Sequence, residues 1–157
     1  MDYLIYSLPR CGSAWLANFL TYDVSFCYHE PLADGTQFKP AKVMPITGAI
    51  DTSAYRTCVR APRMFALTRN YDDIQDSLHR LTPFHSTEDF DLFESRTKDL
   101  ITFHYENLFT VEYLSVIWKL IVGTPFPRHR AELLVEMNIQ RDLDALVRRV
   151  GRAHGVT

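Results

Sequence analysis

A short polar run near the N-terminus has the composition of an anion-binding site. Arg10, Gly12 and Ser13 follow an apolar stretch typical of a buried strand and precede a helical pattern. At such a junction the first helical amides are free to bind a phosphate, and glycine lets the backbone approach it. Arginine adds a delocalised charge suited to oxyanions. The pattern favours a phosphate site as much as an ordinary turn capped by Ser13.

A second polar cluster stands where another apolar stretch runs into a helix. Arg69 ends the apolar stretch, and Ser77 follows eight residues later within the helical pattern. Taken alone, the pair is more typical of a charge at a strand end and a solvated helix serine than of a binding site. A second cation and hydroxyl at a strand-to-helix junction nevertheless strengthens the phosphate hypothesis.

The third cluster could supply a base. His29 and Glu30 close another strand-like stretch, and Pro31 ends it. A carboxylate or imidazole at the mouth of an anion site can remove a proton from an attacking hydroxyl. Glu30 is the candidate general base and His29 the alternative. The competing interpretation is a buried, hydrogen-bonded histidine beside a surface carboxylate.

The first cluster, Pro9-Arg10-Cys11-Gly12-Ser13-Ala14-Trp15, resembles the 5'-phosphosulfate-binding loop of the sulfotransferase family. That loop is commonly a Pro-Lys/Arg-x-Gly-Thr/Ser-x-Trp/Leu run. The resemblance implies that Arg10 faces the bridging oxygen and the 5'-phosphate of the donor. It also implies that Ser13 and the amides of residues 12–14 hold that phosphate, and that Trp15 packs against adenine. Ala14 departs from loops with two consecutive hydroxyl residues, and the Lys-Ser/Thr pair of a Walker-type loop is missing.

The other clusters match the same family in the same order. In the family, an Arg at a strand end and a Ser eight residues later bind the 3'-phosphate, and Arg69 and Ser77 fit this spacing. His29-Glu30-Pro31-Leu32 resembles a His/Phe-Glu-Pro-Leu segment of carbohydrate-type members. Tyr105-Glu106-Asn107-Leu108 resembles a structural Tyr-Glu-x-Leu segment. The resemblance spans about residues 3–123, and the C-terminal Arg-Lys-Gly loop of cytosolic members is not found. It assigns nucleotide binding to Arg10, Cys11, Gly12, Ser13, Ala14, Trp15, Arg69 and Ser77.

The resemblance implies a reaction. A sulfuryl group would move from 3'-phosphoadenosine 5'-phosphosulfate (PAPS) to a hydroxyl, or less readily an amine, of a small molecule or glycan. The product nucleotide would be adenosine 3',5'-bisphosphate (PAP), and no metal is expected. Arg10, Glu30 and His29 are the implied catalytic residues. Two alternatives stay open: a divergent phosphate-loop kinase that uses ATP with magnesium, and a non-catalytic nucleotide-binding module.

The three polar clusters can form one site only in a fold that places the ends of their strands at the same edge of a sheet. Alternating strand and helix patterns predict an α/β domain of three layers, in which helices flank an open and mostly parallel sheet. The resemblance to sulfotransferases implies that this domain has a fold similar to that of phosphate-loop NTPases. Asp51, Thr52 and Ser53 follow one strand, where polar side chains could line a pocket or form a plain turn. The predicted strands are Asp2–Ser7, Val24–Cys27, Ile46–Asp51, Met64–Thr68 and Leu100–Tyr105. The predicted helices lie at about residues 13–22, 74–81, 86–93, 111–122 and 130–150, with Leu81, Leu120, Leu133 and Met137 among the apolar positions.

The composition limits the classes of function. The 157 residues, 46% of them hydrophobic, fit one domain spanning 1–157. A formal net charge of −2 gives no general attraction to nucleic acid or an anionic membrane, so an anion site must be local. The 3 cysteines show no metal-like pairing, and no signal peptide or membrane segment is evident, which favours the cytoplasm. The acceptor and the oligomeric state stay open.

Overall fold

The chain forms a five-stranded parallel sheet. The computed structural model describes residues 1–32, 42–81 and 89–137. The strand order is β2-β3-β1-β4-β5, and every neighbouring pair is parallel. All five predicted strands are confirmed. Their bounds are β1 Tyr3–Ser7, β2 Ser25–His29, β3 Ile46–Asp51, β4 Arg63–Thr68 and β5 Ile101–His104.

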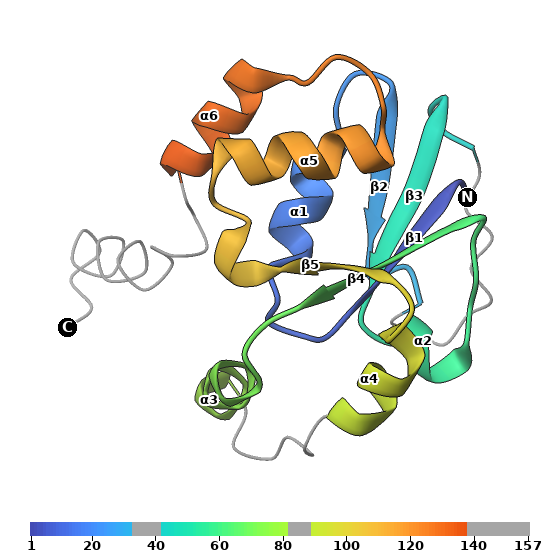
Figure 1. Cartoon of the computed structure of the whole chain (residues 1–157), viewed down its shortest axis with the longest axis vertical. Helices are drawn as coiled ribbons and strands as arrows, with labels where there is room; N and C mark the ends of the chain where they lie inside the picture. Colours follow the sequence, from blue (N-terminus) through green and yellow to red (C-terminus); the bar gives the residue numbers. More distant parts are fainter. Residues whose placement is uncertain (33–41, 82–88, 138–157) are drawn as a thin grey trace, which may run out of the picture.

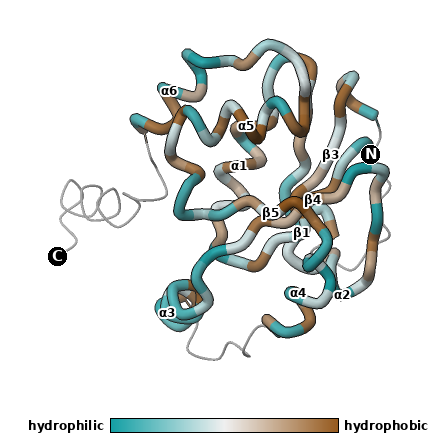
Figure 2. The backbone as a smooth tube through the Cα atoms, viewed as in Figure 1, coloured by the Kyte–Doolittle hydropathy of each residue, from teal (hydrophilic) through white to brown (hydrophobic). Residues whose placement is uncertain are grey.

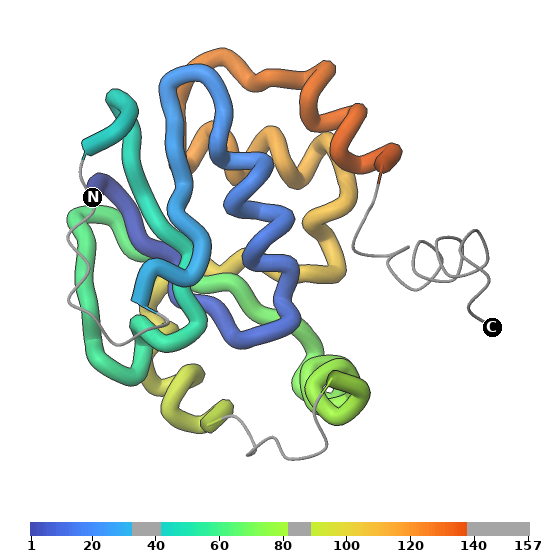
Figure 3. The backbone as a smooth tube through the Cα atoms, turned by 180° about the vertical axis from the view of Figure 1, so that it is seen from behind, coloured from blue at the N-terminus to red at the C-terminus, as the bar shows by residue number. Residues whose placement is uncertain are grey.

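Helices cover both faces of this sheet. Figure 1 shows α1, α5 and α6 on one side and α2 and α4 on the other, and Figure 3 shows the same grouping from behind. The one-turn helix α2 was not predicted. None of the described helices is long and apolar enough to cross a membrane. The helices are α1 Ser13–Leu20, α2 Ala54–Thr57, α3 Tyr71–Leu81, α4 Phe90–Thr97, α5 Val111–Ile121 and α6 Arg128–Met137, with a 3-10 turn, η1, at Tyr105–Asn107.

Strand β1 lies at the centre of the core. It pairs with β3 on one side and β4 on the other, and all five of its residues are buried. A strand covered on both faces reads as a continuous apolar run, which is why the stretch was recognisable in the sequence. Phe19 of α1 and Trp118 of α5 meet edge to face above it, with ring centroids 5.6 Å apart.

The predicted polar clusters lie at one edge of the sheet. Strands β1, β2, β3 and β4 end at Ser7, His29, Asp51 and Thr68, and each end leads directly into a polar segment. Parallel strands deliver their carboxyl ends to the same edge, which is where α/β proteins bind ligands. The topology thus brings together segments that are far apart in sequence.

Several helical positions predicted as apolar core are exposed. Leu81, Leu120, Leu133 and Met137 have exposed fractions of 58%, 39%, 45% and 58%. The 3.6-residue period marks one face of a helix, but neighbouring helices decide how much of that face is covered. In α6 only Ala131 is buried, and α3 is mostly hydrophilic (Figure 2). The predicted helical residues 138–150 lie outside the described part of the chain.

The predicted end of α5 is confirmed, whereas α4 begins at Phe90, after its predicted start at about residue 86. The Asp89 side chain caps α4 by accepting a hydrogen bond of 2.9 Å from the Leu92 amide. Gly123 ends α5 in the left-handed region, with φ of 76°, and its N–H donates to the Trp118 carbonyl.

Candidate active site

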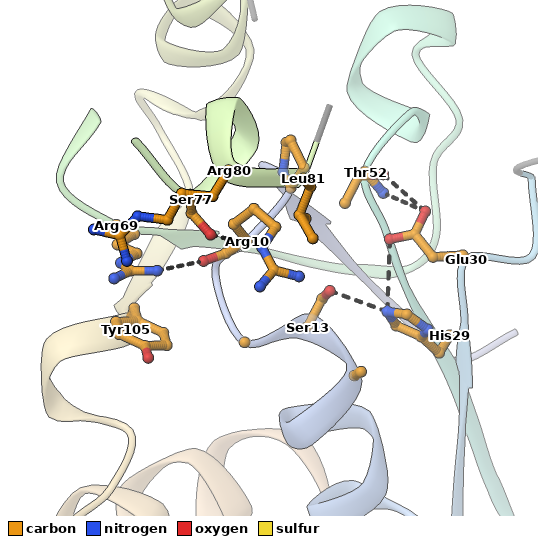
Figure 4. Close-up of a pocket in the computed structure, with 13 residues that line it drawn as sticks. Arg10, Ser13, His29, Glu30, Thr52, Arg69, Ser77, Arg80, Leu81 and Tyr105 are labelled. Atoms are coloured by element: carbon orange, nitrogen blue, oxygen red, sulfur yellow. Dashed lines mark hydrogen bonds and ion pairs between the residues drawn. The ribbon is translucent and has the colours of Figure 1, made fainter. Parts of the chain in front are cut away.

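A polar pocket of about 700 Å³ opens at the carboxyl edge of the sheet. This volume is in the range of small-molecule and nucleotide sites. All three predicted polar clusters contribute to it, together with the end of β3 (Figure 4). The lining residues are Pro9, Arg10, Gly12, Ser13, Ala14, His29, Glu30, Thr52, Arg69, Ser77, Arg80, Leu81 and Tyr105.

The loop between β1 and α1 places backbone amides at the pocket. Gly12 is the N-cap of α1, with φ of 79°, and its carbonyl accepts from the Leu16 amide. The amides of the first helical residues, which begin with Ser13, have no partner within a helix and carry its partial positive charge. A Cβ on Gly12 would lie 3.1 Å from the Tyr105 ring, so this position tolerates little besides glycine. Ser13 does not cap the helix: it is the first helical residue, and its side chain faces His29.

The first and second clusters are in direct contact. The Arg10 Nε donates to the Ser77 Oγ at 2.8 Å, although the two residues are 67 positions apart. The Arg69 Nη1 donates to the Arg10 carbonyl at 3.0 Å. The Arg69 guanidinium also lies over the Tyr105 ring, 4.2 Å from its centroid, a cation–π contact that holds the cation at the pocket wall. The two phosphate-type turns therefore share one site.

Of the four described non-glycine residues with positive φ, two line this pocket. Arg10 has φ of 62° and Glu30 has φ of 53°, both in the left-handed region that non-glycine residues avoid. Each such residue costs about 1–3 kcal/mol and persists where the surroundings dictate its position. The strain marks both ends of the pocket as sites where side-chain direction matters.

The third cluster joins the first through His29. The Ser13 Oγ lies 3.0 Å from the His29 Nε2, and the Glu30 Oε1 lies 3.6 Å from the same nitrogen. In a Ser-His-carboxylate triad the carboxylate contacts the other ring nitrogen, Nδ1. Because Ser13 and Glu30 share Nε2, the three residues do not form a hydrolase triad. A group that can accept a proton nevertheless stands beside the loop between β1 and α1.

The pocket is locally cationic in a chain of net charge −2. Among the described residues, three arginines, Arg10, Arg69 and Arg80, and one carboxylate, Glu30, line it. The Arg69 Nε is buried without a hydrogen-bond partner among the described residues. A buried donor without a partner costs free energy. The arrangement is suited to a polyanionic ligand.

Two residues assigned to nucleotide binding are not at the pocket surface. Trp15 is 7% exposed and packs edge to face on Phe109 with centroids 5.1 Å apart, and its contact with adenine stays a prediction. The third helical position faces the core because α1 lies flat on the sheet. The Cys11 side chain is fully buried, and burial raises the pKa of its thiol to about 12. Neither side chain is among those that line the pocket.

Four lining residues were not predicted as site residues, and one of them, Pro9, was quoted only as part of the loop motif. Tyr105 was interpreted as structural, Leu81 as a buried helical position, and Arg80 was not singled out. Arg80 lies three residues after Ser77, on the same face of α3, so helical spacing could have found it. Thr52 confirms the prediction that polar side chains after β3 line the pocket, whereas Asp51 is fully buried.

Nothing in the described ranges indicates a metal centre. Over residues 1–32, 42–81 and 89–137, no group of three or more His, Cys, Asp or Glu side chains is arranged to hold a metal ion.

Comparisons of the chain with protein-family profiles, curated proteins and solved structures found no match.

Proposed function

We propose that this protein is a sulfotransferase, with a fold of the phosphate-loop type, that transfers a sulfuryl group from PAPS to a hydroxyl. The observation that carries the proposal is the contact between two segments: the loop between β1 and α1, and the segment from the end of β4 into α3. Arg10 and Ser13 belong to one turn, Arg69 and Ser77 to the other, and all four line one pocket. A donor with separate 5'- and 3'-phosphates requires two such anion sites in one cavity.

Different residues would bind the two phosphates of this donor. Arg10, Ser13 and the first amides of α1 would hold the 5'-phosphate, where negative charge grows as the sulfuryl group leaves. Arg69 and Ser77 would hold the 3'-phosphate. The Ser77 Oγ already accepts from Arg10, so its hydroxyl hydrogen is free to donate to a phosphate oxygen.

The reaction is a direct transfer between two oxygens. The acceptor oxygen forms a bond to sulfur while the bond between sulfur and the 5'-phosphate oxygen breaks, and PAP leaves with the electron pair. The acceptor proton passes to Glu30, with His29 as the alternative base. In-line transfer through a loose transition state depends mainly on positioning and charge stabilisation, as in phosphoryl transfer.

Two other functions fit the pocket less well. A phosphate-loop kinase uses a lysine against the nucleotide phosphates, and none of the described residues that line this pocket is a lysine. A kinase also has no use for a second anion site next to Ser77. A non-catalytic binding module would need the phosphate turns but not the strained Glu30 beside them.

Binding and transfer separate these functions experimentally. Isothermal titration calorimetry should show PAP binding without magnesium and more tightly than magnesium-ATP. The reverse preference would support the kinase. Transfer of labelled sulfate from PAPS to a panel of alcohols and glycans then tests catalysis.

Glu30→Gln distinguishes an enzyme from a binding module. The variant should lower the transfer rate by about 10²–10⁴-fold, because it removes the base, while PAP affinity is retained. The matched control is Glu136→Gln, an exposed carboxylate on α6 outside the pocket. Equal transfer rates for Glu30→Gln and the control would refute Glu30 as the base.

A further inference from the structure

Thr52 is bonded twice to the candidate base. Its Oγ1 donates to the Glu30 Oε2 at 2.8 Å, and its backbone N–H donates to the same oxygen at 3.3 Å (Figure 4). Both donors therefore converge on one oxygen of the carboxylate. Hydrogen bonds to an ionised group are among the stronger ones in proteins.

The turn that carries Thr52 is itself held in place. Asp51 is fully buried, and its Oδ1 accepts from the Ser53 amide at 2.7 Å and the Ala54 amide at 2.8 Å. Its Oδ2 accepts from the Leu32 amide at 2.8 Å, which ties the segment after β2 to the end of β3. This network fixes Thr52 relative to Glu30.

The backbone conformation of Glu30 directs its side chain toward Thr52. It lies in the left-handed region, and its amide donates to the Ile50 carbonyl at 2.9 Å. This conformation directs the side chain between the ends of β2 and β3, toward Thr52. With Oε2 occupied by Thr52, the other oxygen, Oε1, lies on the side of His29.

We propose that Thr52 is a positioning residue for the base: by occupying Oε2, it presents Oε1 to the acceptor hydroxyl. This inference rests on the proposed function. The acceptor proton then passes to Oε1, next to the His29 Nε2, while Oε2 keeps both hydrogen bonds. Without the Thr52 hydroxyl the carboxylate can rotate, and the oxygen that faces the acceptor is no longer fixed.

Two substitutions at Thr52 test this role. Thr52→Val keeps the shape and the backbone N–H but removes the hydroxyl, whereas Thr52→Ser keeps the hydroxyl. Thr52→Val should lower kcat by about 10- to 150-fold, the loss of one hydrogen bond to a charged group, with PAP affinity within about 3-fold of the parent protein. Thr52→Ser should recover most of kcat. An unchanged kcat in Thr52→Val, no recovery in Thr52→Ser, or an equal loss of PAP affinity would overturn the proposal.

A second readout does not depend on sulfuryl transfer. The ¹⁵N NMR signals of the His29 imidazole report on Glu30, whose Oε1 lies 3.6 Å from the His29 Nε2. They should change in Thr52→Val and return toward the parent positions in Thr52→Ser. If the parent protein transfers no sulfuryl group, the proposed function fails, and these signals still test the positioning. Signals unchanged in Thr52→Val would refute it.

Discussion

Replacing Ser77 by alanine tests the pairing of the two phosphate turns most directly. Ser77 accepts a hydrogen bond from Arg10 and has one hydroxyl hydrogen left for a ligand. If that hydrogen donates to a 3'-phosphate, Ser77→Ala removes one hydrogen bond to a charged group. Such a bond contributes about 1.5–3 kcal/mol, which corresponds to a loss of affinity of about 10- to 150-fold. Arg10 is exposed, so water can replace its lost acceptor at little cost.

The informative quantity is a ratio of two affinities. Isothermal titration calorimetry with PAP and with adenosine 5'-monophosphate, which lacks the 3'-phosphate, measures how much the 3'-phosphate contributes. The parent protein should favour PAP strongly. In Ser77→Ala the preference should fall by about 10- to 150-fold, while the affinity for the monophosphate changes by less than about 3-fold.

A matched control removes a hydroxyl elsewhere. Ser95 lies on exposed helix α4, where its Oγ donates to the Leu92 carbonyl, and Ser95→Ala should leave the PAP preference intact. The reasoning is refuted if the parent protein binds both nucleotides equally. It is also refuted if Ser77→Ala keeps the full preference, or if both nucleotides lose affinity by the same factor.

Further predictions concern the backbone and the buried thiols. Cys58 follows α2 with φ of 54°, a conformation that strains residues other than glycine. Cys58→Gly should therefore raise the free energy of unfolding in urea by about 0.5–1 kcal/mol. An equal gain in Cys58→Ala would contradict relief of this strain as the cause. Gly12→Ala should cost about 1–3 kcal/mol and weaken PAP binding, because it adds a contact of 3.1 Å with Tyr105 to the strain of a positive φ. Gly123→Ala shares the positive φ, but its new Cβ would make only an ordinary contact, 3.9 Å from the Lys119 carbonyl oxygen, so its measured loss of stability should be smaller. Burial raises the pKa of the Cys27 thiol from 9.0 to about 12, so the folded protein keeps a proton that the unfolded chain releases. The protonated thiol therefore contributes stability that is complete below about pH 9 and is lost as the pH rises toward 12. In Cys27→Ala the free energy of unfolding should fall less steeply over that pH range. Denaturant titration at each pH measures this slope.

Local sequence patterns determined the elements of the sheet. The strand at Ile46–Asp51 was predicted with its observed bounds, and β1 was recognisable as a continuous apolar run. The strand-to-helix junctions, together with the family resemblance, pointed to Arg10 and Ser77, and both line the pocket. These features depend on residues within a few positions of each other, which is the range over which strand and helix periods act.

The tertiary structure decided which of these residues meet. Nothing local in the sequence specifies that Arg10 donates to Ser77, or that Thr52 bonds Glu30 across two strands, since both contacts depend on the order of strands in the sheet. The same holds for burial. Trp15 faces the core and Leu81 faces the pocket, because the packing of α1 and α3 determines which side of each helix is covered.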